Sequence, residues 1–211
     1  MSPANGFWIG LRTGTRRQAC SNFSLPAPPA VFIGFGSIAG RNPERTTAVV
    51  LQALRLSGQR GVLVGGWGGL HTSSAPDTVR FLEFVPYDWL LPNVAAVVHH
   101  GGAGSTAEGL RAGKPTAVCP FFGDQPFWGR RVFELGVGPL PLPQKRLTVS
   151  ALADAIHAAV ADEGMRRRAA ALGEKIRSEN GVQRAVDMVH GLHRRWRHDA
   201  GDLRRKGHVG K

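Results

Sequence analysis

Short apolar segments alternate with amphipathic segments along the middle of this chain, and that alternation constrains the fold more than any other feature. The apolar segments end in glycine or proline and read as buried strands, over 30–36, 61–66, 79–86, 95–102 and 116–120. Between them lie segments with apolar residues at helical spacing, over 44–58, 105–113 and 125–135. Such alternation predicts βαβ units and a parallel sheet with helices on both faces.

We therefore expect an α/β fold, a doubly wound, Rossmann-like parallel sheet built from about five or six such units between residues 30 and 140. Residues 148–193 read as a run of helices. In a doubly wound sheet, ligands bind at the carboxyl ends of the strands. The candidate site loops are therefore those at 34–40, 84–90, 99–106 and 120–129.

The positive charge is concentrated at the two ends of the chain, although the whole is formally +12 with a pI near 11.3. Residues 1–26 hold three arginines and no acid, and residues 194–211 hold seven Lys and Arg against two acids. Such ends suit nucleic acid or anionic lipid, but a solvated tail is the more common outcome. We expect an irregular lead-in over 1–29, one folded domain over 30–193 and a disordered basic tail over 194–211.

Cysteine usage and hydropathy exclude several classes of protein. Two cysteines, Cys20 and Cys119, cannot build a disulfide framework or a cysteine-rich zinc fold. Cys119 reads as a buried strand residue rather than a nucleophile. No apolar stretch approaches the roughly 18 residues of a membrane span, and no signal peptide is evident. We therefore expect a cytoplasmic protein without stable membrane insertion.

Residues 99–110, HHGGAGSTAEGL, carry the strongest indication of a ligand. A predicted strand ends in two histidines, turns through glycines and enters a helix at Ser105 and Thr106. Free N–H groups and the positive end of the helix dipole make such a turn an anion site, which the glycines let a phosphate approach. The alternative is an ordinary glycine turn with a serine N-cap. The adjacent histidines favour the anion site.

A dinucleotide-like pattern, G-x-G-x-x-A, is embedded in the same stretch from Gly102 onward. Asp124 even lies where a ribose-binding acid would fall. That pattern belongs to the first βαβ unit of a dinucleotide fold, whereas at least three predicted strands come earlier here. We therefore disfavour NAD binding.

Three longer motifs together resemble a known family: FVPYDWLL (84–91), VVHHGGAGSTAEGLRAGKPT (97–116) and PFFGDQPFWGRR (120–131). They are similar to the donor-binding signature of family 1 UDP-sugar glycosyltransferases, especially the sterol glucosyltransferase and macrolide or glycopeptide glycosyltransferase branch. GFGS at 34–37 fits the same branch. The likeness spans about residues 28–190 and implies the C-terminal, donor-binding half of a GT-B fold.

The resemblance implies a role for each matching residue. His100 would contact the diphosphate, Glu108 would accept from the ribose hydroxyls, and Asp124 with Gln125 would hold the sugar hydroxyls. Glu108 could equally be a solvated helix acid, and Asp124 a helix N-cap. The implied donor-binding residues are Ser37, His100, Gly102, Gly104, Ser105, Thr106, Glu108, Asp124 and Gln125.

The chain also departs from the family pattern. Gly104 stands where the plant signature has an asparagine, so one phosphate or sugar contact is expected to be missing. The uracil-stacking tryptophan of that signature falls near Phe84, and we expect the backbone at Val85 to meet the base instead. Trp89 and Trp128 read as packing residues.

The implied activity is inverting transfer of a hexose from UDP or dTDP to a hydroxyl of a lipid, sterol or polyketide acceptor. The donor would be a substrate, and no metal or other cofactor is expected. Only about 30 residues precede the first predicted strand, so the acceptor domain and its general base are expected to be absent. We assign no catalytic residue, and expect the isolated chain to be inactive without a separate acceptor-binding chain.

Two other functions remain open at the level of the sequence. The chain could be a non-catalytic nucleotide-sugar-binding module or a degenerate remnant of a transferase. A basic nucleic-acid-binding protein driven by the charged ends is less favoured, and we expect no nucleic-acid partner.

Overall fold

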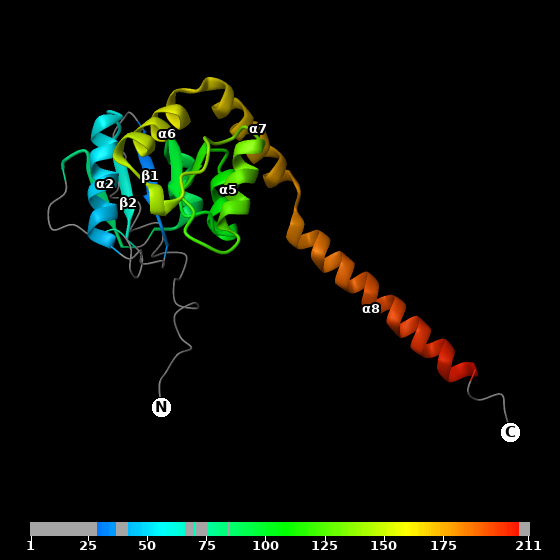
Figure 1. Cartoon of the computed structure of the whole chain (residues 1–211). Helices are drawn as coiled ribbons and strands as arrows, with labels where there is room; N and C mark the ends of the chain where they lie inside the picture. The colour runs from blue at the N-terminus through cyan, green and yellow to red at the C-terminus, as the bar shows by residue number, and fades with distance from the viewer. Residues whose placement is uncertain (1–28, 37–41, 66–69, 71–75, 84, 207–211) are drawn as a thin grey trace. The chain divides into compact units, whose positions relative to one another are not determined.

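The structure is a computed structural model that describes residues 29–36, 42–65, 70, 76–83 and 85–206 (Figure 1). Its strands are β1 (Val31–Gly34), β2 (Gly61–Val64), β3 (Val79–Leu82), β4 (Ala96–His99) and β5 (Thr116–Val118). Its helices are α2 (Pro43–Leu56), α3 (Tyr87–Leu90), α4 (Ala103–Arg111), α5 (Gln125–Glu134), α6 (Val149–Ala161), α7 (Glu163–Ser178) and α8 (Gly181–Lys206). Two 3-10 turns occupy Leu91–Asn93 and Gln144–Arg146.

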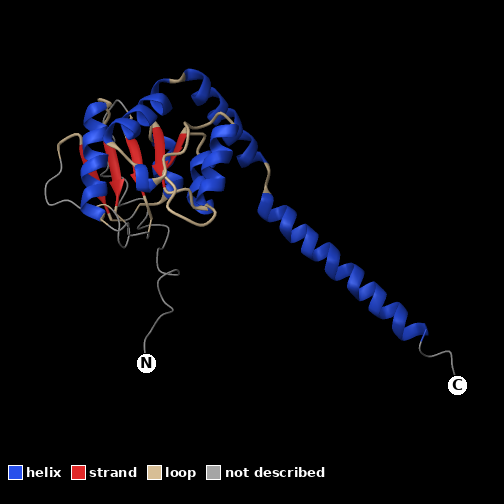
Figure 2. Cartoon of the chain, in the orientation of Figure 1, coloured by secondary structure: helices blue, strands red, loops and turns tan. Residues whose placement is uncertain are grey.

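The strands form one sheet in which every pairing is parallel (Figure 2). Their order is β3-β2-β1-β4-β5, so the chain builds outward from β1 in one direction and then returns to the other side of β1. This confirms the predicted α/β, doubly wound sheet. Each of the five predicted strand segments contains one of these strands.

Alternate residues of the strands face two separate cores, as the period of two requires. Val31 and Ile33 of β1 face the side covered by α2 and α6, whose buried residues include Leu54 and Ile156. Phe32 faces the opposite side, where the chain packs residues from α3 and the turn after it; that core contains Leu90, Leu91, Val94 and Val97. Burial on both faces explains why the strands read as continuous apolar runs.

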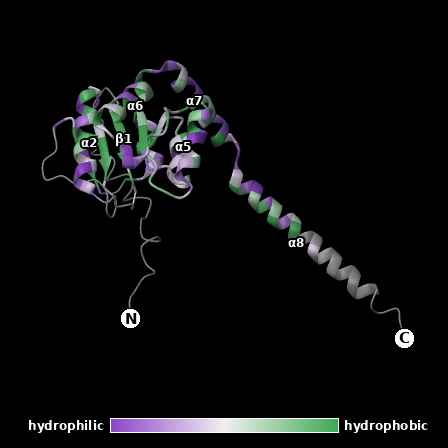
Figure 3. Ribbon diagram, viewed as in Figure 1, coloured by the Kyte–Doolittle hydropathy of each residue, from purple (hydrophilic) through white to green (hydrophobic). Residues whose placement is uncertain are grey.

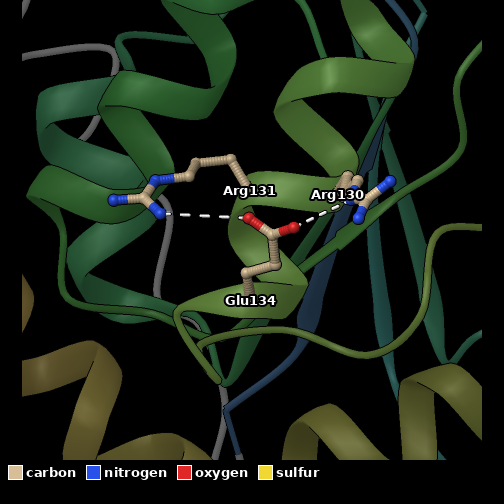
Figure 4. A network of polar contacts seen from close by, with 3 residues as sticks. All are labelled: Arg130, Arg131 and Glu134. Carbon is tan, nitrogen blue, oxygen red and sulfur yellow. Dashed lines mark hydrogen bonds and ion pairs between the residues drawn. The ribbon is translucent and has the colours of Figure 1, made fainter.

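Polar side chains define the ends and outer faces of several helices. Asn42 accepts a hydrogen bond from the N–H of Arg45 at 2.8 Å and so caps α2, and Thr148 caps α6 through the N–H of Ala151 at 3.2 Å. On the outer face of α5, Glu134 pairs with Arg130 at 2.8 Å and with Arg131 at 3.9 Å (Figure 4). These pairs are exposed, so they contribute little to stability.

The chain divides into two units, Met1–Glu174 and Lys175–Lys211, whereas we predicted a domain over 30–193. The disordered tail expected from 194 also differs from the structure, because 194–206 continue α8. That stretch contains no proline and is rich in arginine, which favours helix. Apolar and polar residues alternate along the part of α8 coloured by hydropathy (Figure 3). The lead-in over 1–28 and residues 207–211 lie outside the described residues.

Candidate functional site

The candidate site lies where the strand order reverses. β1 and β4 are neighbours in the sheet, with Gly34 opposite His99 at their carboxyl ends. The first connection from β1 runs to β2 on one side, and β4 continues to β5 on the other. Such a reversal leaves a crevice between the loops that follow the two central strands, which is where open α/β sheets bind ligands.

His99 anchors the turn that follows β4. Its side chain is fully buried, and its Nδ1 accepts a hydrogen bond from the N–H of Gly101 at 2.8 Å. Burial, with a smaller contribution from neighbouring His100, lowers the pKa of His99 to about 3. The ring is therefore neutral and carries its proton on Nε2, which has no hydrogen-bond partner among the described residues. The sequence analysis did not predict that His99 holds this turn, although a histidine at the buried end of a predicted strand could have indicated it.

His100 places its imidazole between the turns after β1 and β4. A Cβ atom added at Gly102 would lie 2.5 Å from Nε2 of His100, and one added at Gly36 would lie 3.2 Å from Cε1. Gly36 also has a φ of +65°, which favours glycine. Burial lowers the pKa of His100, and the nearby charge of Asp124 opposes that shift. The predicted diphosphate residue thus lies at the strand reversal, close to the predicted sugar-binding acid.

Helix α4 begins two residues earlier than predicted, with Gly102 as its N-cap. Ser105 is therefore not the N-cap but the third residue of the helix, and it is half-buried. The N–H groups of 103–105 have no carbonyl four residues back within the helix, so they point out of its N-terminus. This end of α4 has the donors and the dipole of an anion site.

Thr106 has a structural role in this turn. It is 1% exposed, and both its N–H and its hydroxyl donate to the carbonyl oxygen of Gly102 at 2.9 Å. Because a hydroxyl has a single proton to donate, that of Thr106 is already used within the helix. Thr106 is one of the implied donor-binding residues, but in this geometry its hydroxyl proton holds the first turn of α4.

Glu108 lies one turn further along α4. It is half-buried and pairs with Arg111 at 3.6 Å, a separation typical of a partly exposed ion pair. The free N–H groups at the N-terminus of α4 and the carboxylate of Glu108 thus lie one turn apart on the same helix. A ligand that carries both a phosphate and hydroxyl groups would require such an arrangement.

Asp124 and Gln125 behave differently although they are neighbours. Asp124 is exposed and precedes α5, but its carboxylate does not cap that helix. Gln125 is 5% exposed, and its Oε1 accepts from the N–H of Phe121 at 2.8 Å and of Phe122 at 3.3 Å. Its amide oxygen therefore holds the loop before Asp124, a role that the sequence analysis missed.

Gly101 is the point at which the turn after β4 packs against the loop after β5. It has a φ of +90°, and an added Cβ would lie 3.0 Å from the carbonyl oxygen of Gln125. The turn after β4 and the loop after β5 are thus packed against each other. This contact brings Asp124 within electrostatic reach of His100.

The remaining candidate residues divide into described and undescribed ones. Ser37 and Phe84 lie outside the described residues, while Val85 is 7% exposed. Cys119 is fully buried, as predicted, and burial raises its pKa to about 12, so the thiol stays protonated. The described residues contain no group of three or more metal-ligating side chains and no helix long and apolar enough to cross a membrane.

We expect Gly102→Ala to displace the His100 ring without a backbone penalty. Gly102 has φ −61° and ψ 141°, which alanine adopts readily, so the contact with Nε2 of His100 is the main effect. The imidazole NMR signals of His100 should shift. Gly104→Ala is the matched control, since a Cβ there meets nothing within 4 Å. It should leave those signals in place and stabilise α4 by about 0.5–1 kcal/mol. Unchanged imidazole signals in Gly102→Ala would contradict the described position of the ring.

Comparisons with known proteins identify the family to which this chain belongs. Residues 68–191 match the family described as "Erythromycin biosynthesis protein CIII-like, C-terminal domain". Sterol 3-beta-glucosyltransferase UGT80A2 of Arabidopsis thaliana is 47% identical over 157 residues, which are 74% of this chain and 24% of that protein. The sterol 3-beta-glucosyltransferase of Emericella nidulans is 42% identical over 168 residues, covering 76% of this chain and 12% of that protein.

Solved structures give the same result. The calicheamicin glycosyltransferase CalG4 superposes with a TM-score of 0.69 at 26% identity, over 80% of this chain and 43% of its own. The glycosyltransferase VinC, solved with dTDP, superposes with a TM-score of 0.59 at 23% identity, over 74% of this chain and 39% of its own, and supports the fold alone. The chain thus spans about a quarter of the plant relatives it matches. It belongs to the erythromycin biosynthesis protein CIII-like C-terminal domain family, among the GT-B glycosyltransferases of family 1.

Proposed function

We propose that this chain binds the nucleotide-sugar donor for a glycosyltransferase that transfers a hexose from UDP to a hydroxyl of a sterol or related lipid or polyketide. Relatives that are 47% and 42% identical to this chain are sterol 3-beta-glucosyltransferases, which supports this acceptor class. The observation that carries the proposal is the position of His100. Its ring lies at the strand reversal, next to the N-terminus of α4 and near the carboxylate of Asp124.

Each group in the proposed site has a distinct task. His100, Ser105 and the first N–H groups of α4 would bind the diphosphate and stabilise it as it leaves with an extra negative charge. Glu108 would accept from the ribose hydroxyls and Asp124 from the sugar hydroxyls. Thr106 and Gln125 act indirectly in this proposal, by shaping the turn and the loop that present these groups. The general base and the acceptor contacts would come from residues other than those assigned here.

The first test is binding of UDP and uridine to the 211-residue chain. We expect UDP to bind in the micromolar to millimolar range by calorimetry or ligand-observed NMR, with the same affinity in EDTA. His100→Ala should weaken UDP binding about 10- to 150-fold, because a hydrogen bond to a charged group contributes about 1.5–3 kcal/mol. Uridine lacks the phosphates, so its affinity should not change.

His157→Ala, on the exposed side of α6, is the control and should alter neither ligand. Folded chain that binds no UDP up to several millimolar would contradict the proposed function. An equal loss of UDP and uridine in His100→Ala would remove His100 from the diphosphate site. UDP binding without transfer, even when an acceptor-binding chain is supplied, would favour a non-catalytic nucleotide-sugar-binding module.

A further inference from the structure

Trp128 contacts the carboxylate of Asp124. Its indole Nε1–H donates to Oδ2 of Asp124 at 2.9 Å, and its backbone N–H donates to the carbonyl oxygen of Asp124 at 3.2 Å. Residues four apart at a helix end lie on the same face, which brings the two side chains together. We predicted Trp128 to be a packing residue, and the structure adds this polar contact.

The indole bond engages one oxygen of the carboxylate, and no described residue donates to the other. Among the described residues, the indole is the only hydrogen-bond donor recorded for the side chain of Asp124. The N–H groups of α5 do not hold that side chain, because it makes no capping bond. A carboxylate accepts through both oxygens, so Oδ1 can accept from a ligand hydroxyl while Oδ2 stays bonded to Trp128.

Two further contacts hold this arrangement in place. The Phe127 ring meets the Trp128 ring edge-on, with centroids 5.1 Å apart and planes at 77°, which restricts the indole. On the other side of Asp124, Gln125 holds the backbone of Phe121 and Phe122 through its amide oxygen. The acid is therefore positioned both through its backbone and through its side chain.

We infer that Trp128 is a positioning residue that sets the donor site's preference for the sugar part of its ligand, acting through Asp124. This inference rests on the proposed function, which assigns Asp124 to the sugar hydroxyls. A carboxylate that is already oriented loses less rotamer freedom when it binds a hydroxyl than an unrestrained one does. The nucleotide does not contact this carboxylate in the proposed site, so its affinity does not depend on Trp128.

Trp128→Phe tests the inference, because phenylalanine keeps an aromatic ring and removes only the indole donor. Calorimetry or ligand-observed NMR on the 211-residue chain should show a loss of about 3- to 10-fold in affinity for UDP-glucose. The affinity for UDP should stay the same. Trp196→Phe makes the same change at an exposed tryptophan of α8 and should alter neither affinity.

A double-mutant cycle with Asp124→Ala separates positioning from general packing. In the Asp124→Ala background, Trp128→Phe should cause no further loss of UDP-glucose affinity. The indole 1H–15N signal of Trp128, identified by its absence in Trp128→Phe, should shift when Asp124 is replaced by alanine.

The possible failures are distinguishable. If the unmodified chain binds no UDP, the proposed function is wrong and this inference is wrong with it. If UDP binds but Trp128→Phe leaves UDP-glucose affinity unchanged, only the inference is overturned. Equal losses for both ligands, or a further loss in the Asp124→Ala background, would show that Trp128 acts on the fold and not through Asp124.

Discussion

Gly101→Ala is expected to destabilise the folded chain by about 3 kcal/mol, the sum of a backbone penalty and a steric penalty. Gly101 has a φ of +90°, and a residue other than glycine is destabilised by about 1–2 kcal/mol in the left-handed region of backbone conformation. The added Cβ would also lie 2.6 Å from Cγ1 of Val118 and 3.0 Å from the carbonyl oxygen of Gln125. Those neighbours belong to β5 and the start of α5, which must move apart to accept it.

Gly123→Ala is the matched control for this substitution. Gly123 lies in the loop before α5 with a φ of +66°, and a Cβ there meets nothing within 4 Å. It should therefore show the backbone penalty alone, about 1–2 kcal/mol. Denaturant unfolding of both variants gives the comparison. Equal destabilisation would mean that the turn after β4 and the loop after β5 are not packed together as described.

Acid is expected to destabilise the chain through His99 before the carboxylates are protonated. The pKa of His99 is about 3 in the folded chain and about 6.5 in an unfolded one. Between these values the unfolded chain binds a proton that the folded chain does not. The stability that depends on the neutral His99 ring is therefore complete above pH 6.5. As the pH falls below 6.5, the free energy of unfolding decreases by up to about 1.4 kcal/mol per pH unit.

Unfolding in denaturant at pH 7, 6 and 5 measures this loss. His99→Asn removes the titrating ring and should flatten the dependence of stability on pH, while its amide oxygen remains an acceptor for the turn. His100→Asn should flatten it less, because His100 is only half-buried and the charge of Asp124 opposes the lowering of its pKa. In the unmodified chain the NMR signals of His99 should stay those of a neutral ring down to pH 5. A ring that titrates near pH 6.5 in the folded chain would contradict its burial.

Local patterns in the sequence were sufficient for the five strands, for most of the helices and for the turn at 99–106. Apolar runs such as 61–66 and helical spacing such as that of 44–58 lead to β2 and α2 because period and punctuation are properties of neighbouring residues. The segment 99–106 was recognisable for the same reason, since a strand end, a glycine turn and a helix start follow one another along the chain. The sequence therefore determined the fold class and pointed to the turn that holds His100 and Ser105, while the family resemblance added Glu108 and Asp124 as candidates.

Only the tertiary structure decided how those candidates work together. Whether β4 lies beside β1 depends on packing between residues far apart in the sequence, and this placement brings the His100 ring against Gly36. The sequence alone also does not show which hydroxyls and amides are already hydrogen-bonded within the fold. Thr106 and Gln125 matched the pattern but proved to hold the backbone, whereas His99 and Trp128 acquired polar contacts through burial and helix geometry. The physical reason is that a sequence motif specifies which groups are present, while burial and strand order determine which of them remain free to bind a ligand.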